Sequence, residues 1–161
     1  MTKEDFLQIV NKYQYIIKKY SIIYGNGIMS SEDLNQEILY NLWKSHSSFK
    51  SNCGLNTWVY RITINTCITS VRLKNKEGKR LELRNALGIC DDDNTVKNEN
   101  IELIHNIIGQ LSLIDQSLML LWLEEKSYKE IAEIMGLSET NIASRLNRCK
   151  EKVINRFNHI K

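Results

Sequence analysis

The sequence predicts an all-α protein made of two small helical domains joined by a linker. Apolar residues recur every three or four positions along most of the 161 residues, alternating β-branched runs are scarce, and proline is absent. A chain of this length can bury one full core or two small ones. The helical period lapses over residues 85–98, which favours two domains, 1–80 and 99–161, with a linker over 81–98.

The first 46 residues predict two helices separated by a break at Gly25-Asn26-Gly27. The first helix covers residues 1–24, and Ser31 is expected to cap the second, residues 32–46. The inner side of the second helix would hold apolar side chains, namely Leu34, Ile38, Leu39, Leu42 and Trp43. Its outer side would be largely polar and acidic, with Asp33, Gln36, Glu37, Tyr40 and Asn41. Taken alone, such a face is most often simply solvent-exposed.

A loop over residues 47–55 leads into a third helix that opens at Asn56 and Thr57. Phe49, Trp58 and Tyr60 stand near a basic run that extends from residue 72 to residue 84. Single-stranded nucleic acids bind where bases stack on aromatic rings and cations follow the backbone, so this combination suggests such a site. Trp58 and Tyr60 are equally compatible with ordinary core positions.

The second half predicts a helix from Glu99, another over residues 113–126, and then two helices joined by a short turn. The turn falls at Gly136, where a helix would end, and Ser138 would cap the last helix. That helix has an apolar stripe of Ile142, Leu146, Cys149, Val153 and Phe157. Two helices around a short glycine-containing turn are typical of a helix-turn-helix motif, whose second helix enters the DNA major groove.

The opposite face of the last helix has side chains suited to DNA. It combines short hydrogen-bonding residues with one arginine: Thr140, Ser144, Asn147, Arg148 and Glu151. Such side chains bond base edges and phosphates. Arg145, Lys152 and Arg156 flank this face and are expected to reach the DNA backbone. The alternative is an amphipathic helix with a solvated polar side.

Charge is unevenly distributed along the chain, although the net charge is only +3. Residues 44–84 contain nine basic and two acidic residues, a net +7, and residues 91–125 contain eight acidic and one basic, a net −7. Residues 126–161 return to +4. Two basic blocks around an acidic one indicate two nucleic-acid-facing surfaces. The other interpretation is that the acidic and basic segments pair with each other.

Several functional classes lack sequence support. The four cysteines are scattered without metal-ligand spacing, and Asp91-Asp92-Asp93 lacks the alternating ligands of a calcium loop, so we expect no metal and no cofactor. The histidines are isolated and no glycine-rich phosphate loop occurs, so we expect no enzyme activity. Without a signal peptide or a run of 18 apolar residues, the protein is expected to be cytoplasmic and not inserted in membranes.

Three stretches in order resemble bacterial RNA polymerase sigma factors of the sigma-70 family, of the extracytoplasmic-function (ECF, group 4) type. They are residues 32–38 with Trp43, residues 57–65, and residues 127–138 continuing into 144–148. The resemblance covers almost the whole chain. It implies a region 2-like bundle and a region 4-like helix-turn-helix domain. The expected function is promoter recognition and help in DNA melting, with core RNA polymerase doing the chemistry.

The resemblance also implies roles for individual residues. Contacts with the polymerase β′ clamp helices would come from Asp33, Gln36 and Glu37. The −10 promoter element, with one base flipped into the segment 50–56, would be bound by Phe49, Lys50, Asn56, Trp58, Arg61, Asn65, Arg72 and Lys74. The −35 element would be bound as duplex by Lys129, Ser138, Thr140, Ser144, Asn147 and Arg148. The resemblance further implies the β flap and an anti-sigma factor as partners.

The chain departs from the family pattern at three places. Leu111-Ser112 stands where Leu-Pro is usual, Ala143 where Lys or Arg is frequent, and Arg72-Leu73 where two arginines are common. These departures bear on promoter sequence and affinity. The alternative function is a stand-alone helix-turn-helix regulator, which should bind duplex DNA tightly without polymerase. A module that binds polymerase without contacting DNA fits poorly with the basic block at 44–84.

Overall fold

The computed structural model describes residues 1–25, 29–75 and 99–160, which form seven α-helices, one 3₁₀ turn and no sheet. The chain divides into two compact units, Met1–Glu82 and Leu83–Lys161. The expectation of an all-α chain with two small helical domains is therefore confirmed. The linker expected at 81–98 and the Asp91–Asp93 run lie outside the described residues.

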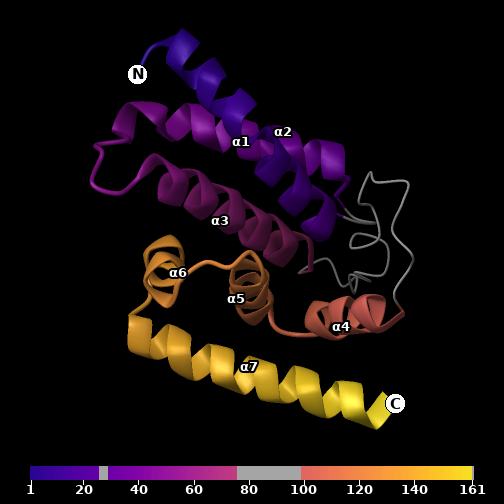
Figure 1. The fold of residues 1–161 in the computed structure, drawn as a ribbon. Helices are drawn as coiled ribbons and strands as arrows, with labels where there is room; N and C mark the ends of the chain where they lie inside the picture. The colour runs from indigo at the N-terminus through magenta and orange to yellow at the C-terminus, as the bar shows by residue number, and fades with distance from the viewer. Residues whose placement is uncertain (26–28, 76–98, 161) are drawn as a thin grey trace. The chain divides into compact units, whose positions relative to one another are not determined.

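Unit 1 is a three-helix bundle in which every pair of helices is in contact (Figure 1). Its helices are α1 (Lys3–Tyr24), α2 (Ser31–Ser45) and α3 (Leu55–Asn75), with the 3₁₀ turn η1 (His46–Ser48) after α2. The bundle forms because each helix places an apolar stripe toward the other two. The largest fully buried side chains of this core are Ile17, Tyr20, Leu34, Ile38, Leu42 and Ile64.

The N-caps of α1 and α2 are a threonine and a serine. Thr2 and Asp5 form a reciprocal capping box at the start of α1. The cap of α2 is Ser30, whose Oγ accepts the Asp33 N–H at 3.1 Å. The expectation that Ser31 is the cap was wrong by one residue, because Ser31 is already helical and its hydroxyl turns to the Glu32 carboxylate.

Two side chains of α2 lie elsewhere than the apolar pattern predicted. Trp43, expected on the inner side, is 42% exposed and packs edge-on against Phe6, with ring centroids 5.0 Å apart, and parallel to His46. Asn41, expected on the outer side, is half-buried and donates to Thr66 Oγ1 of α3 at 3.2 Å. Asn41 lies at the boundary between α2 and α3 and forms its hydrogen bond within the bundle. Helical periodicity alone does not predict such a bond.

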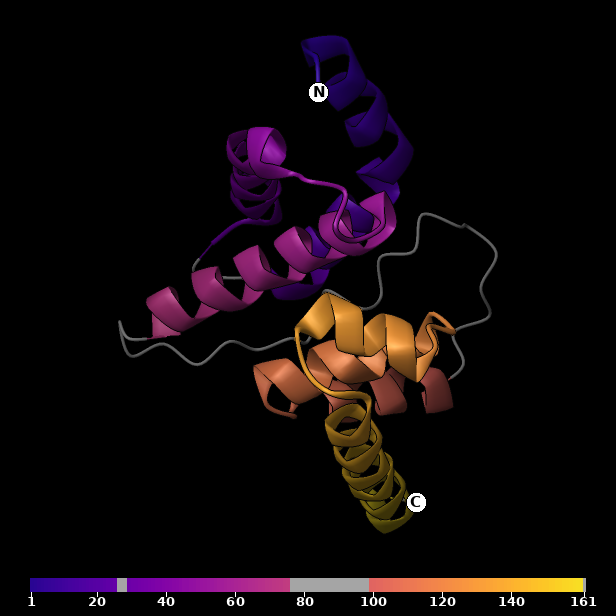
Figure 2. The same ribbon diagram turned by 90° about the vertical axis from the view of Figure 1, so that its left-hand side faces the viewer.

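Unit 2 contains α4 (Glu99–Gly109), α5 (Leu113–Leu123), α6 (Tyr128–Met135) and α7 (Glu139–Ile160). The long helix α7 contacts each of the other three, passing α6 near its start and α4 toward its end (Figures 1 and 2). The helix expected over 113–126 ends earlier, at Leu123. Glu125 adopts a left-handed backbone with φ of 61°, which a continuing right-handed helix does not accommodate.

The helix-turn-helix prediction is confirmed in its local geometry. Ser127 and Glu130 form a capping box at the start of α6, and Gly136 ends that helix in the left-handed region with φ of 68°. Ser138 Oγ accepts the Asn141 N–H at 3.1 Å where α7 begins. The apolar stripe of α7 is buried at Ile142, Leu146, Cys149 and Val153, and half-buried at Phe157.

Candidate polymerase and nucleic-acid interfaces

The acidic side of α2 is accessible in the first half of that helix. Asp33 and Gln36 are exposed, and Glu37 is half-buried. Asn41 approaches Glu37 Oε1 at 3.5 Å while it bonds to α3, so the amide joins this face to the bundle. One turn further along, Tyr40 is 58% exposed. This face therefore offers the exposed carboxylate of Asp33, the exposed amide of Gln36 and the exposed ring of Tyr40. It also offers the carboxylate of Glu37, which Asn41 holds in place.

The loop before α3 is anchored by an aromatic contact. Phe49 is half-buried against Trp58, with ring centroids 5.0 Å apart and planes at 44°. Trp58 is only 8% exposed and Tyr60 only 3%, so both occupy core positions, as one of the two interpretations held. Ser51 takes a left-handed backbone with φ of 55°, a conformation that is uncommon for residues other than glycine.

One stripe of α3 presents polar and basic side chains beside this loop. Arg61, Asn65, Thr69 and Arg72 follow one another at spacings of four, four and three, which places them on the same side of the helix. Arg61 is half-buried, and the other three are exposed. The stripe extends over about 16 Å at the rise of an α-helix. Lys50 is exposed in the loop and Asn56 is half-buried in the first turn of α3, while the side chain of Lys74 lies outside the described residues.

The polar face of α7 is exposed throughout its first half. Exposed side chains on this helix and at its start include Ser138, Thr140, Ser144, Asn147 and Arg148. Lys129 is exposed on α6. Short polar side chains followed by a guanidinium match what base-edge and phosphate contacts require. All the expected −35 residues therefore share the accessible part of the helix-turn-helix motif.

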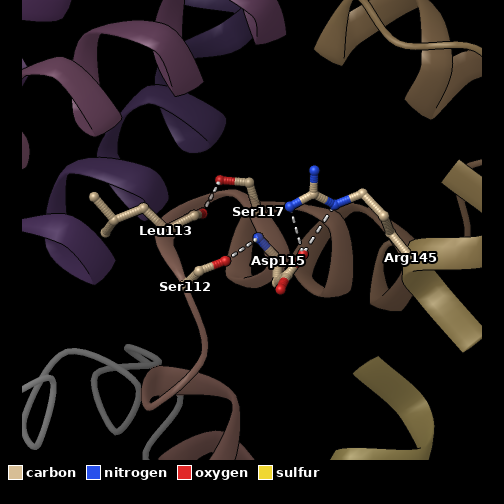
Figure 3. Close-up of polar contacts among 5 residues, drawn as sticks. All are labelled: Ser112, Leu113, Asp115, Ser117 and Arg145. Atoms are coloured by element: carbon tan, nitrogen blue, oxygen red, sulfur yellow. Dashed lines mark hydrogen bonds and ion pairs between the residues drawn. The ribbon is translucent and has the colours of Figure 1, made fainter. Parts of the chain in front are cut away.

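Arg145 and Arg156, expected to reach the DNA backbone, instead bond to side chains within unit 2. The Arg145 Nε and Nη2 atoms both lie 3.1 Å from Asp115 Oδ1 of α5 (Figure 3). Arg156 donates to Gln110 Oε1 at 3.0 Å. Lys150 makes a similar link, since its Nζ donates to Tyr128 OH at 3.2 Å and lies 4.4 Å from the ring centre of Trp122.

Asp115 is the residue of this region that sequence reasoning missed. Its N–H donates to Ser112 Oγ at 3.2 Å, so it stands in the first turn of α5, and its carboxylate meets α7 thirty residues later in the chain. The Ser112-x-x-Asp115 spacing is a detectable capping signal. The pairing with Arg145 was not predictable, because it depends on how α5 and α7 cross.

The buried thiols are poorly suited to reactivity. Burial raises the pKa of Cys67, and burial together with the nearby Asp115 charge raises the pKa of Cys149. Among residues 1–25, 29–75 and 99–160, no three histidine, cysteine or acidic side chains gather in a way that could hold a metal ion. No helix within those ranges is long and apolar enough to span a bilayer.

Comparison with known families gives two matches that together cover most of the chain. Residues 8–77 match the family described as Sigma-70 region 2. Residues 101–153 match the family described as Sigma-70, region 4. The first match lies within unit 1 and the second within unit 2.

Individual relatives point the same way. The chain is 25% identical to the RNA polymerase sigma-H factor of Pseudomonas aeruginosa, over 94% of this chain and 85% of that protein. It is 32% identical to the ECF RNA polymerase sigma factor SigG of Mycobacterium tuberculosis over 76 residues, and this match spans only 19% of that protein. The fold is similar to the sigma factor RpoE of Bartonella quintana, solved in complex with the anti-sigma factor NepR, with TM-score 0.71, 20% identity, and coverage of 93% of this chain and 94% of that one.

Proposed function

This chain belongs to the ECF group of the sigma-70 family, and from that premise we propose that it directs RNA polymerase to promoters and helps to melt them. Members of this family are non-enzymatic initiation factors, so the polymerase supplies the chemistry. The observation that carries the proposal is the presence, in separate units, of two exposed polar and basic helix faces together with an acidic face on α2.

The acidic face of α2 is proposed to dock on core RNA polymerase. Asp33 and Gln36 are exposed, and Glu37 is held beside Asn41. Carboxylates bind guanidinium and ammonium groups through charge-assisted hydrogen bonds, so the receiving surface on the polymerase should be basic. In the sigma-70 family that surface is the β′ clamp helices.

The loop before α3 and the stripe along α3 are proposed to bind the melted −10 element. A single strand offers phosphates to Lys50, Arg61 and Arg72, and an unstacked base to the loop. Because Trp58 is buried, its contribution would be to hold Phe49 and the loop rather than to stack on DNA directly. Asn56, in the first turn of α3, and Asn65, on the stripe, would provide hydrogen bonds to base edges.

The polar face of α7 is proposed to bind the −35 element as a duplex. Ser144, Asn147 and Arg148 are exposed on consecutive turns and would reach base edges and phosphates in the major groove. Lys129 and the residues at the start of α7 would contact the flanking phosphates. Because Arg145 and Arg156 bond to side chains within unit 2, α7 would make fewer phosphate contacts than its sequence suggested.

The proposed function also implies a cellular location and two further partners. The chain would act in the cytoplasm, where RNA polymerase works. The polymerase β flap would bind unit 2. An anti-sigma factor would regulate the chain, by analogy with RpoE, which has a similar fold and was solved in complex with NepR.

The test is a selection of DNA duplexes that contain a long randomised segment, using core RNA polymerase with and without the full chain. With the chain present, recovered DNA should contain two sequence blocks at a fixed spacing, and thymines in the downstream block should become reactive to permanganate. Core polymerase alone should select neither block. If the chain selects duplex DNA tightly without polymerase and melts nothing, it is the stand-alone regulator instead.

A further inference from the structure

The contact between Arg145 and Asp115 singles out one residue of α7 whose role differs from that of its neighbours. Arg145 lies in sequence between Ser144 and the Asn147-Arg148 pair, and on the helix surface it flanks the face proposed to bind the −35 element. Its side chain is 28% exposed, and that of Asp115 is 16% exposed. Two guanidinium nitrogens of Arg145, Nε and Nη2, point to a single carboxylate oxygen of Asp115 on α5 (Figure 3).

Asp115 is itself fixed in place, which makes it a suitable anchor. It stands in the first turn of α5, with its N–H bonded to Ser112 Oγ, and Ser117 Oγ bonds to the Leu113 carbonyl in the same turn. Negative charge is favourable at a helix N-terminus. The carboxylate also adjoins Cys149 of α7, whose thiol pKa is raised by burial and by the charge of Asp115. If Arg145 turned away to bind a DNA phosphate, the partly buried carboxylate of Asp115 would lose its ion-pair partner, which is unfavourable.

We propose that Arg145 is a positioning residue that sets the rotation of α7 about its own axis through Asp115, and that it does not contact DNA. The apolar stripe of Ile142, Leu146 and Cys149 holds α7 against the unit, but apolar packing is non-directional. The hydrogen bond from Arg145 Nε to Asp115 Oδ1, with the ion pair from Nη2 to the same oxygen, is directional and fixes the angle at which Ser144, Asn147 and Arg148 face outward. This inference rests on the proposed function of α7.

The experiment compares Arg145→Gln, Asp115→Asn and the double variant in the full chain, with Arg148→Gln as the control for a phosphate contact. The probe is the duplex that wild type selects with core polymerase, and affinity is measured across a salt series. In Asp115→Asn the backbone N–H of residue 115 still donates to the capping Ser112 Oγ, so the change to α5 is mild. Asp115→Glu restores the charge and is a second variant should Asp115→Asn fold poorly. Thermal unfolding of each variant sets a temperature at which all are folded.

If Arg145 positions α7, each single variant weakens binding by about tenfold and the double variant is no weaker than either, because one interaction is lost in all three. In these variants the slope of log affinity against log salt concentration stays as in wild type. In Arg148→Gln the magnitude of that slope falls by about one. Asp115→Glu recovers much of the affinity.

Two results would overturn the inference. A salt slope lowered by about one in Arg145→Gln, with Asp115→Asn unaffected, would make Arg145 a phosphate contact. Wild-type affinity in folded variants of lowered thermal stability would make the pair merely structural. Failure of wild type to select any duplex would instead contradict the proposed function of α7, so the two failures are distinguishable.

Discussion

At the scale of single residues, the acidic member of a capping box is tied to folding through its charge. Glu130 accepts the Ser127 N–H at 2.7 Å in its carboxylate form, and this hydrogen bond lowers the pKa of Glu130 below its ordinary value of 4.5. Asp5 has a lowered pKa for the same reason, through Thr2. The charged form is thus favoured in the folded protein at both helix starts.

This coupling predicts how stability depends on pH. A group whose pKa is lowered by folding stabilises the protein at pH values above its ordinary pKa, and that contribution is lost as the pH falls through the lowered value. Wild type should therefore lose part of its stability below about pH 4.5, and Glu130→Gln should lose less over that range because the amide does not titrate. Thermal unfolding of unit 2 between pH 3 and pH 7 measures the difference. Parallel pH curves for the two proteins would contradict the assignment.

Asn65 is expected to matter for single-stranded DNA and not for folding. It is exposed on the α3 stripe, so Asn65→Ala removes a polar group without opening a cavity. In complex with core polymerase, the variant should bind the non-template strand of the −10 block about tenfold more weakly, through the loss of base hydrogen bonds. Asn11→Ala, an exposed asparagine on α1, is the matched control and should bind as wild type does. Equal binding by both variants would remove Asn65 from the site.

At the scale of helices, the sequence predicted every α-helix of the described residues but not every boundary, and it missed the 3₁₀ turn His46–Ser48. Periodicity located seven helices because each one buries a stripe at helical spacing. The cap of α2 was misplaced by one residue, because Ser30 and Ser31 are chemically equivalent and only the backbone geometry separates them. The end of α5 was misplaced because residues 124–126 are good helix formers and the left-handed turn at Glu125 has no sequence signature.

The cap of α2 gives a paired test. Ser30→Ala should destabilise unit 1 by about 1 kcal/mol, since it leaves the Asp33 N–H without its cap. Ser31→Ala removes only an exposed hydroxyl contact with Glu32 and should change stability much less. Urea unfolding and amide exchange at the start of α2 measure both. A larger loss in Ser31→Ala would place the cap where the sequence first suggested.

The turn between α6 and α7 depends on the backbone of Gly136. With φ at 68°, Gly136→Ala should cost about 1–2 kcal/mol, because a Cβ is disfavoured in the left-handed region. No atom lies within 4 Å of a Cβ at that position, so the cost would come from backbone strain and not from a clash. Gly136→Asn should be tolerated better, since asparagine adopts this conformation more readily. Similar melting temperatures for Gly136→Ala and wild type would contradict this account.

At the scale of the whole molecule, the sequence predicted the family but not the contacts between distant segments. The charge blocks pointed to nucleic-acid-facing surfaces, and the three ordered motifs pointed to the ECF sigma factors. The matches over residues 8–77 and 101–153, together with the ECF relatives, place the chain in that family. Contacts between distant segments could not be predicted, because they depend on helix crossing. Arg145 with Asp115, Arg156 with Gln110, and Asn41 with Thr66 are examples. Each turns a side chain expected at the surface toward its own unit.

The central claim, that this chain is a polymerase subunit docked through α2, is tested most directly by capture of core RNA polymerase on the immobilised full chain. Wild type and a control, Glu102→Ala with Glu151→Ala, should capture it stoichiometrically, since those two exposed acids lie on α4 and α7. Asp33→Ala with Glu37→Ala should lose capture while its circular dichroism stays as in wild type. Undiminished capture by this double variant would contradict the docking face, and no capture by wild type would contradict the claim as a whole.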